Sequence, residues 1–173
     1  QALRSTGLMD DSLVVVLSDH GEEFWDHGGF EHGHTLHDEL LHVPLIIRPP
    51  GHHAGAVTVD SAVRLVDLAP TICELAGLSV PREFSGRSLV PLLDGLQKTD
   101  RPVLSSGNMW GATGYAWRRG AYKLIWSPDQ ADPALYHVEQ DPHEQVNLAT
   151  DRPRVLQLML TQLRGVLSGL GDE

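Results

Sequence analysis

Asp19 and His20 are the residues whose types and adjacency most clearly suggest chemistry in this chain. They follow the apolar run Leu13-Val-Val-Val-Leu17, which predicts a short strand buried on both faces. In open α/β sheets, sites lie just beyond the carboxyl ends of the strands. A carboxylate oxygen beside an imidazole nitrogen forms a reasonable half of a divalent-metal site, provided that the backbone turns at Gly21. An ordinary turn after the strand is the alternative interpretation.

Histidines crowd the segment that follows this strand. Six of the ten in the chain lie there: His20, His27, His32, His34, His37 and His42. The glycine-rich stretch 21–34 has no helical or strand period, so we expect a loop over the strand ends. His27 and His34 lie in this loop and have an ordinary interpretation as solvated side chains, and His37 and His42 have one as surface or partly packed residues. His32 is the best candidate, because a protonated imidazole there would bind an anionic ester oxygen or act as the acid for a leaving group.

The remaining pattern predicts the elements that position these residues. A short helix is expected over 35–41, a second strand over 43–47, and a helix over 67–77 with Cys73 as a core residue. Four short strands follow at 103–106, 114–117, 121–126 and 135–138, and an amphipathic helix covers 153–170. This order predicts an α/β part followed by a smaller antiparallel subdomain.

Composition narrows the class of protein. The chain has 173 residues, 41% hydrophobic and 21% charged, which is typical of a soluble globular protein. A net charge of -10 argues against nucleic acid or an anionic membrane as the main partner. A small anionic substrate stays open, because a bound cation inverts the local field. One cysteine rules out an internal disulfide, and no apolar run is long enough to span a bilayer.

Several motifs in order along the chain resemble the second half of a sulfatase, in the alkaline phosphatase superfamily. The matching pieces are Ser18-Asp-His-Gly-Glu-Glu-Phe24, His32-Gly-His-Thr-Leu36, Val43-Pro-Leu-Ile-Ile47, Val66-Asp-Leu-Ala-Pro-Thr71, Leu75-Ala-Gly77, Gly86-Arg-Ser-Leu89, Tyr122-Lys-Leu-Ile125, Leu135-Tyr136 and Asp141-Pro-His-Glu144 with Asn147-Leu148. The resemblance implies the later part of a mostly parallel sheet with flanking helices over 1–98. A small antiparallel sheet with a packed C-terminal helix would then occupy 99–173.

The resemblance also implies a site. Asp19 and His20 would be ligands of a divalent metal ion, with calcium (Ca2+) as the first choice and Mn2+ or Zn2+ as alternatives. The family places a basic residue against the sulfate some dozen positions later, which matches His32, or His34 if the loop aligns differently. The implied substrate is a small-molecule or saccharide sulfate ester.

Two features of the sulfatase pattern are absent from this sequence. Sulfatases carry a Cys- or Ser-x-Pro-x-Arg motif whose first residue becomes formylglycine, and an N-terminal acidic pair; here Cys73 is followed by Glu-Leu-Ala. Since the sequence begins with Gln1 rather than Met, we expect the nucleophile, the remaining ligands and any export signal to lie upstream. The cellular location therefore stays open. The chain alone is predicted to be inactive, with weak or missing metal.

Other interpretations remain open. The same superfamily includes phosphonate and phosphate monoester hydrolases and phosphoethanolamine-type transferases, and a non-catalytic fragment is the third possibility. A parallel sheet that lacks its first strands would expose a bare edge. We therefore expect the isolated chain to be marginally stable or to associate with itself through that edge.

Overall fold

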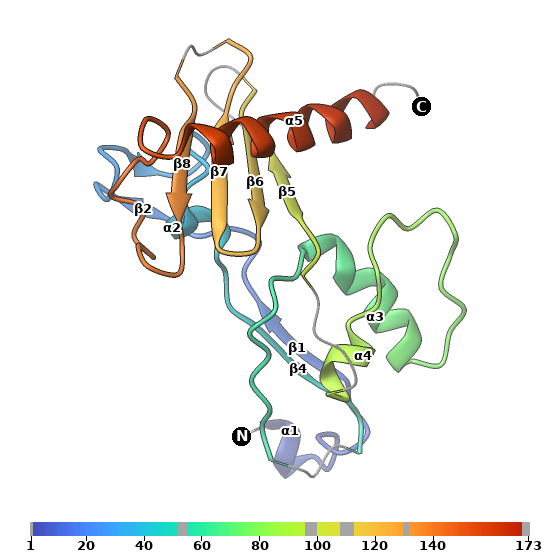
Figure 1. The fold of residues 1–173 in the computed structure, drawn as a ribbon. Coiled ribbons are helices and arrows are strands. Elements are labelled where there is room, and N and C mark those ends of the chain that lie inside the picture. Colours follow the sequence, from blue (N-terminus) through green and yellow to red (C-terminus); the bar gives the residue numbers. More distant parts are fainter. Residues whose placement is uncertain (1, 52–54, 96–99, 108–112, 130–131, 171–173) are drawn as a thin grey trace. The chain divides into compact units, whose positions relative to one another are not determined.

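The computed structural model describes residues 2–51, 55–95, 100–107, 113–129 and 132–170 (Figure 1). The chain forms two compact units. Unit 1 comprises Gln1–Asp19 and Pro44–Asp100, and unit 2 comprises His20–Val43 and Arg101–Glu173. The predicted boundary between residues 98 and 99 falls outside the described residues, and the division into 1–98 and 99–173 stays a prediction.

Two strands form the sheet of unit 1. Strand β1 (Val14–Leu17) pairs antiparallel with β4 (Leu45–Arg48), and Leu17 lies opposite Leu45. Both strands were expected from their β-branched runs, but the expected parallel pairing is not found among the described strands. The last residue of β1, Leu17, lies opposite the first residue of β4, Leu45, so the chain runs back along β1 in the opposite direction. A parallel partner would need a crossover connection that returns the chain to the start of β1. The expectation that the first strand is buried on both faces is also wrong, since Val16 of β1 and Ile46 of β4 are exposed.

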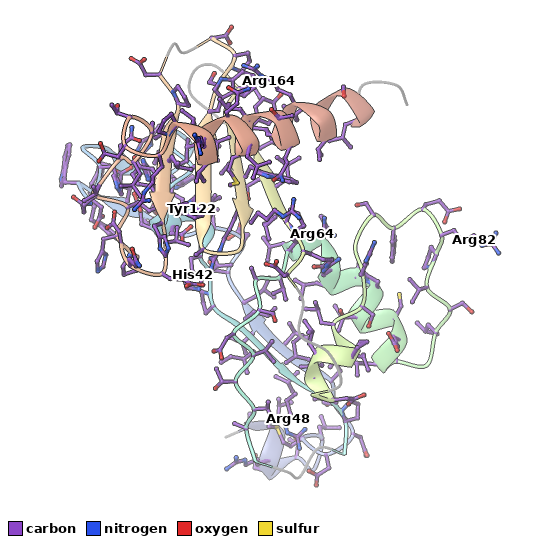
Figure 2. The ribbon with its side chains drawn as sticks, viewed as in Figure 1. His42, Arg48, Arg64, Arg82, Tyr122 and Arg164 are labelled. Atoms are coloured by element: carbon purple, nitrogen blue, oxygen red, sulfur yellow. The ribbon has the colours of Figure 1, made fainter. Side chains whose placement is uncertain are left out.

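Short helices accompany this sheet in unit 1. They are α1 (Ala2–Ser5), the 3-10 helix η1 (Leu65–Asp67), α3 (Leu68–Leu75) and α4 (Val90–Leu93). The helix expected over 67–77 is confirmed, and Gly77 ends it with a φ of 70°. Asp67 occupies the N-cap position without a side-chain cap bond. Its buried carboxylate instead accepts hydrogen bonds from the backbone N–H groups of Arg64 (3.0 Å) and Arg87 (2.8 Å); Figure 2 labels Arg64.

An antiparallel sheet and one long helix form the core of unit 2. The strands are β5 (Val103–Ser106), β6 (Tyr115–Arg119), β7 (Tyr122–Trp126) and β8 (Ala134–His137), paired in that order. Helix α5 (Pro153–Leu170) lies across them (Figure 1). The buried cluster consists of Trp117, Leu124, Leu135, Met159 and Leu163. The predicted antiparallel sheet with a packed C-terminal helix is therefore confirmed, and with it the α/β class.

Neither α5 nor any other helix within the described ranges combines the length and apolarity needed to cross a bilayer.

The histidine-rich segment 20–43 is part of unit 2. It contains a short ribbon of β2 (Glu23–Phe24) and β3 (Phe30–Glu31), followed by α2 (Asp38–Leu41). The sequence predicted a loop without strands here, because strands of two residues carry no detectable period. The expected helix over 35–41 begins only at Asp38, with His37 at its N-cap.

Candidate functional site

The turn after β1 carries the predicted ligand pair. Asp19 and His20 are both exposed. The Nδ1 of His20 lies 2.7 Å from the carbonyl oxygen of Gly21, which can only accept, so Nδ1 carries the proton. In the neutral imidazole the lone pair then resides on Nε2, the atom that would bind a metal. Gly21 itself packs tightly against α2, since a Cβ there would lie 1.9 Å from the carbonyl oxygen of Glu39.

The structure brings His32 to this turn. Its imidazole stacks on that of His20 with the ring centroids 4.2 Å apart and 29° between the planes. Its Nδ1 donates to the carboxylate Oε1 of Glu22 at 3.0 Å. The side chains of His32 and Glu22 are each 40% exposed. These three residues, which we call the histidine pair and its carboxylate, form a solvent-accessible group that can contact an anion.

His34 has a different environment. Its Nε2 lies 2.8 Å from the carboxylate Oε2 of Glu23, which is buried. The expectation of a plainly solvated side chain is therefore wrong for His34. Burial alone would raise the pKa of Glu23, but hydrogen bonds from the N–H groups of Gly29 and His27 and from His34 lower it below its usual range. His34 stabilises this carboxylate, whereas His32 is the histidine beside the strand end.

A second, buried group of charges lies in unit 2. Glu144 is 1% exposed, and its carboxylate Oε2 accepts hydrogen bonds from the Nδ1 of His37 and the N–H of Asp38, both at 2.9 Å. The ammonium Nζ of Lys123, 2% exposed, lies 2.8 Å from Glu144 Oε1 and 2.6 Å from Asp38 Oδ1. Burial favours the neutral form of Glu144, yet the His37 hydrogen bond and the Lys123 charge lower its pKa below the ordinary value. We call Glu144, Lys123, Asp38 and His37 the buried charge network.

His27 is joined to this network as a cation. Its Nδ1 lies 2.7 Å from the carboxylate Oε1 of Glu39, and its Nε2 lies 3.0 Å from the carbonyl oxygen of Glu144. Both partners accept, so both ring nitrogens donate and the ring is an imidazolium. Burial opposes the charge, but these two contacts raise the pKa of His27. The ring stacks on His37 with centroids 3.5 Å apart, so the expected solvated role is wrong for His27 as well.

Glu144 and Lys123 lie in the family motifs Asp141-Pro-His-Glu144 and Tyr122-Lys-Leu-Ile125, but the sequence predicted no role for either charge. Ionised groups are almost never fully buried unless they are paired. The apolar neighbours of Lys123 in a predicted strand were therefore the available signal for a buried pair.

The donor chemistry of Asp19 and His20 suits a divalent cation but does not complete its coordination. In the part of the chain that the structure describes, no group of three or more His, Cys, Asp or Glu side chains is arranged to hold a metal ion. Calcium takes six to eight oxygen ligands, and zinc takes four ligands. The pair therefore fits part of such a site.

Comparison with known proteins places the chain among the sulfatases. Residues 25–169 match the family model described as N-sulphoglucosamine sulphohydrolase, C-terminal, and the chain belongs to that family of sulfatase C-terminal portions. The resemblance drawn from the sequence motifs is thereby confirmed.

Individual relatives are similar to the chain over nearly all of its length. The chain is 32% identical over 179 residues to arylsulfatase K of Bos taurus, covering 96% of this chain and 33% of that protein. A protein solved in complex with its substrate D-glucosamine-2-N,6-O-disulfate matches with a TM-score of 0.79 and 26% identity, over 99% of this chain and 37% of that one. Phosphonate monoester hydrolase of Agrobacterium radiobacter matches with a TM-score of 0.78 and 29% identity, over 97% and 36%. The chain thus spans about a third of the length of the curated relative.

Proposed function

We propose that residues 1–173 form the C-terminal portion of a sulfuric-ester hydrolase. The match of residues 25–169 to a sulfatase family carries this proposal. The nucleophile, a formylglycine, and the remaining metal ligands would come from sequence outside these residues. The chain alone would then supply part of the site and no attacking group, and we expect it to be inactive.

Asp19 and His20 would hold a divalent metal ion through a carboxylate oxygen and Nε2. Calcium (Ca2+) is our first choice, with Mn2+ or Zn2+ as alternatives that a mixed carboxylate and imidazole site also suits. When bound, the cation would neutralise charge on the ester and polarise it. The hydrogen bond from His20 Nδ1 to the Gly21 carbonyl supports this assignment, because in the neutral ring it places the lone pair on Nε2.

His32 would contact the sulfate group of the substrate. As an imidazolium it donates from Nε2 to a sulfate oxygen, or passes that proton to the leaving ester oxygen. Glu22, at 3.0 Å from Nδ1, holds the ring in orientation. We assign this contact to His32 rather than His34, because the Nε2 of His34 binds the buried carboxylate of Glu23.

The proposed substrate is a saccharide sulfate ester. A relative solved with a sugar disulfate as its substrate supports this class. The likeness to a phosphonate monoester hydrolase supports a second candidate, in which the same residues contact a phosphonate monoester.

The test uses the complete natural polypeptide that contains these residues. Purified protein is assayed on an aryl sulfate, a sugar sulfate and an aryl phosphonate monoester, with metal content measured in parallel. Asp19→Asn and His20→Gln are expected to lose bound metal and at least about a hundredfold in turnover. Asp60→Asn, at an exposed aspartate of unit 1, is the matched control and should change neither. Turnover confined to the phosphonate ester would favour the second candidate.

Residues 1–173 alone give two further tests of this proposal. No sulfate ester should be hydrolysed, and measurable turnover by this chain would contradict the assignment of the nucleophile to other sequence. The exposed apolar residues Val16, Leu17 and Ile46 on β1 and β4 support self-association through this sheet. A clean monomer by light scattering that melts cooperatively at high temperature would count against it.

A further inference from the structure

The ribbon of β2 and β3 reverses the usual distribution of residue types. Glu23 is buried, whereas its neighbours Phe24 and Trp25 are 65% and 68% exposed, and Phe30 is 50% exposed. Charged groups are buried only when paired, and clustered exposed apolar groups mark binding sites. We refer to Phe24, Trp25 and Phe30 as the aromatic ribbon.

The three rings form one surface. The ring of Phe30 stacks with that of Trp25 at a centroid distance of 5.6 Å, and meets that of Phe24 edge-on at 5.9 Å. Adjacent residues in a regular strand point to opposite faces. Phe24 and Trp25 can therefore both contact Phe30 only if the backbone at Trp25 departs from regular strand geometry. Trp25 has a φ of 71°, a left-handed conformation that a bulky residue rarely adopts. Backbone strain of this kind persists mainly at functional sites.

A buried carboxylate fixes the turn that connects the two strands. Glu23 Oε1 accepts hydrogen bonds from the N–H of His27 at 2.9 Å and of Gly29 at 2.7 Å, while Oε2 binds His34. A Cβ on Gly29 would lie 2.1 Å from the His34 ring nitrogen, so a larger residue there would have to displace the His34 ring. The rings are thus held in place before a ligand arrives, which lowers the cost of ordering on binding.

We propose that the aromatic ribbon binds the unsulfated sugar unit next to the sulfated one, a proposal that rests on the function proposed above. Phe30 precedes His32 by two residues and Phe24 follows Glu22 by two. Both strands of the ribbon therefore run directly into the hydrogen-bonded pair of Glu22 and His32, of which His32 is assigned to the sulfate. The negative faces of aromatic rings attract the polarised C–H bonds on the face of a pyranose ring.

Charge around the rings selects a neutral sugar. The carboxylates of Asp26 and Glu31 are exposed on the ribbon, where they can accept hydrogen bonds from sugar hydroxyls. Their negative charge opposes a second sulfate and opposes an anionic lipid surface. The ribbon is therefore suited to an uncharged ring that extends from the sulfated unit.

The test compares Trp25→Ala, Trp25→Phe and the control Phe84→Ala, an exposed phenylalanine of unit 1, in the complete polypeptide. Two substrates are used: a sulfated monosaccharide, and a disaccharide that adds one neutral sugar to the same unit. Trp25→Ala should lower kcat/KM for the disaccharide about tenfold and leave the monosaccharide unchanged. Trp25→Phe should retain most of the activity, and Phe84→Ala all of it.

Three results would overturn the proposal. The first is an equal loss of kcat/KM on both substrates in Trp25→Ala, and the second is no loss on either substrate. The third is equal acrylamide quenching of the tryptophan fluorescence of the wild type and Trp25→Phe, which would mean that other parts of the protein cover Trp25. If the wild type turns over neither substrate, the proposed function fails and the ribbon is tested separately. Saturation-transfer NMR with the unsulfated disaccharide then decides: transfer that Trp25→Ala abolishes supports the ribbon, and no transfer overturns it.

Discussion

Replacing Glu144 with Gln is expected to destabilise unit 2 strongly. The carboxylate is 1% exposed, accepts hydrogen bonds from His37 and Asp38, and faces Lys123 at 2.8 Å. Removing one partner of a buried ion pair costs roughly 3–5 kcal/mol, because the other charge stays buried. Lys123 keeps Asp38 at 2.6 Å, so we expect the lower end, about 3 kcal/mol. With a slope of about 2 kcal/mol/M, the urea midpoint would fall by about 1.5 M.

The assay is urea unfolding, with amide hydrogen exchange in unit 2 as a local measure. The matched control is Glu139→Gln, which neutralises an exposed glutamate five positions earlier and should change the free energy of unfolding by less than about 0.5 kcal/mol. A double variant that combines Glu144→Gln with Lys123→Met should recover part of the lost free energy of unfolding, because both charges of the buried pair are then removed together. A Glu144→Gln variant as stable as the control would refute the reasoning.

Three further expectations concern pH and packing. The pKa of His27 is raised in the folded chain, so its charge stabilises the fold fully below the unfolded pKa of about 6.5, and this contribution is lost as pH rises through the folded pKa. In His27→Gln the decline in urea midpoint that begins above about pH 6.5 should disappear. The pKa of Glu144 is lowered, so the pH dependence is opposite: its charge stabilises the fold above about pH 4.3, and this stabilisation is lost as the pH falls through the folded pKa. In Glu144→Gln the urea midpoint should therefore fall less steeply on acidification. Gly86→Ala should lower the stability of unit 1 by roughly 1–3 kcal/mol in thermal unfolding, because the added Cβ would lie 1.8 Å from the Val66 carbonyl oxygen. Gly165→Ala, which meets nothing within 4 Å, should not destabilise unit 2 and serves as the control.

Elements with a clear hydrophobic period were predictable from the sequence. The strand at 13–17, the four C-terminal strands and the helix Pro153–Leu170 all follow local patterns, and the structure forms them. The antiparallel pairing of β1 with β4 was not predicted, because both the apolar run at 13–17 and the family resemblance indicated a parallel sheet. The ribbon at 23–31 escaped prediction because it buries Glu23 and exposes Phe24, against the usual preference of both residue types.

The residue types of the candidate site were predictable from the sequence, but the direction in which each side chain points was not. Asp19 and His20 follow a recognisable strand, and adjacency in the chain keeps them together. The choice between His32 and His34 stayed open, because spacing does not tell where a side chain points. In the folded chain their partners differ: His32 bonds to Glu22 and His34 to Glu23.

The buried charge network explains why the C-terminal part of the chain matters to the histidine-rich segment. Helix α2 has four residues, too few for an isolated helix to be stable in water. Its N-cap, His37, makes no side-chain cap bond, so the Glu144 carboxylate, 106 positions from Asp38, binds the N–H of Asp38 in its place. A carboxylate at this end also complements the helix dipole. The turn at Glu144 therefore caps α2 from a distant part of the sequence, and the same turn holds His27 through its carbonyl oxygen. Because α2 packs against Gly21, this contact reaches the residue next to His20, and a defect at Glu144 should disturb the strand-end site as well as stability.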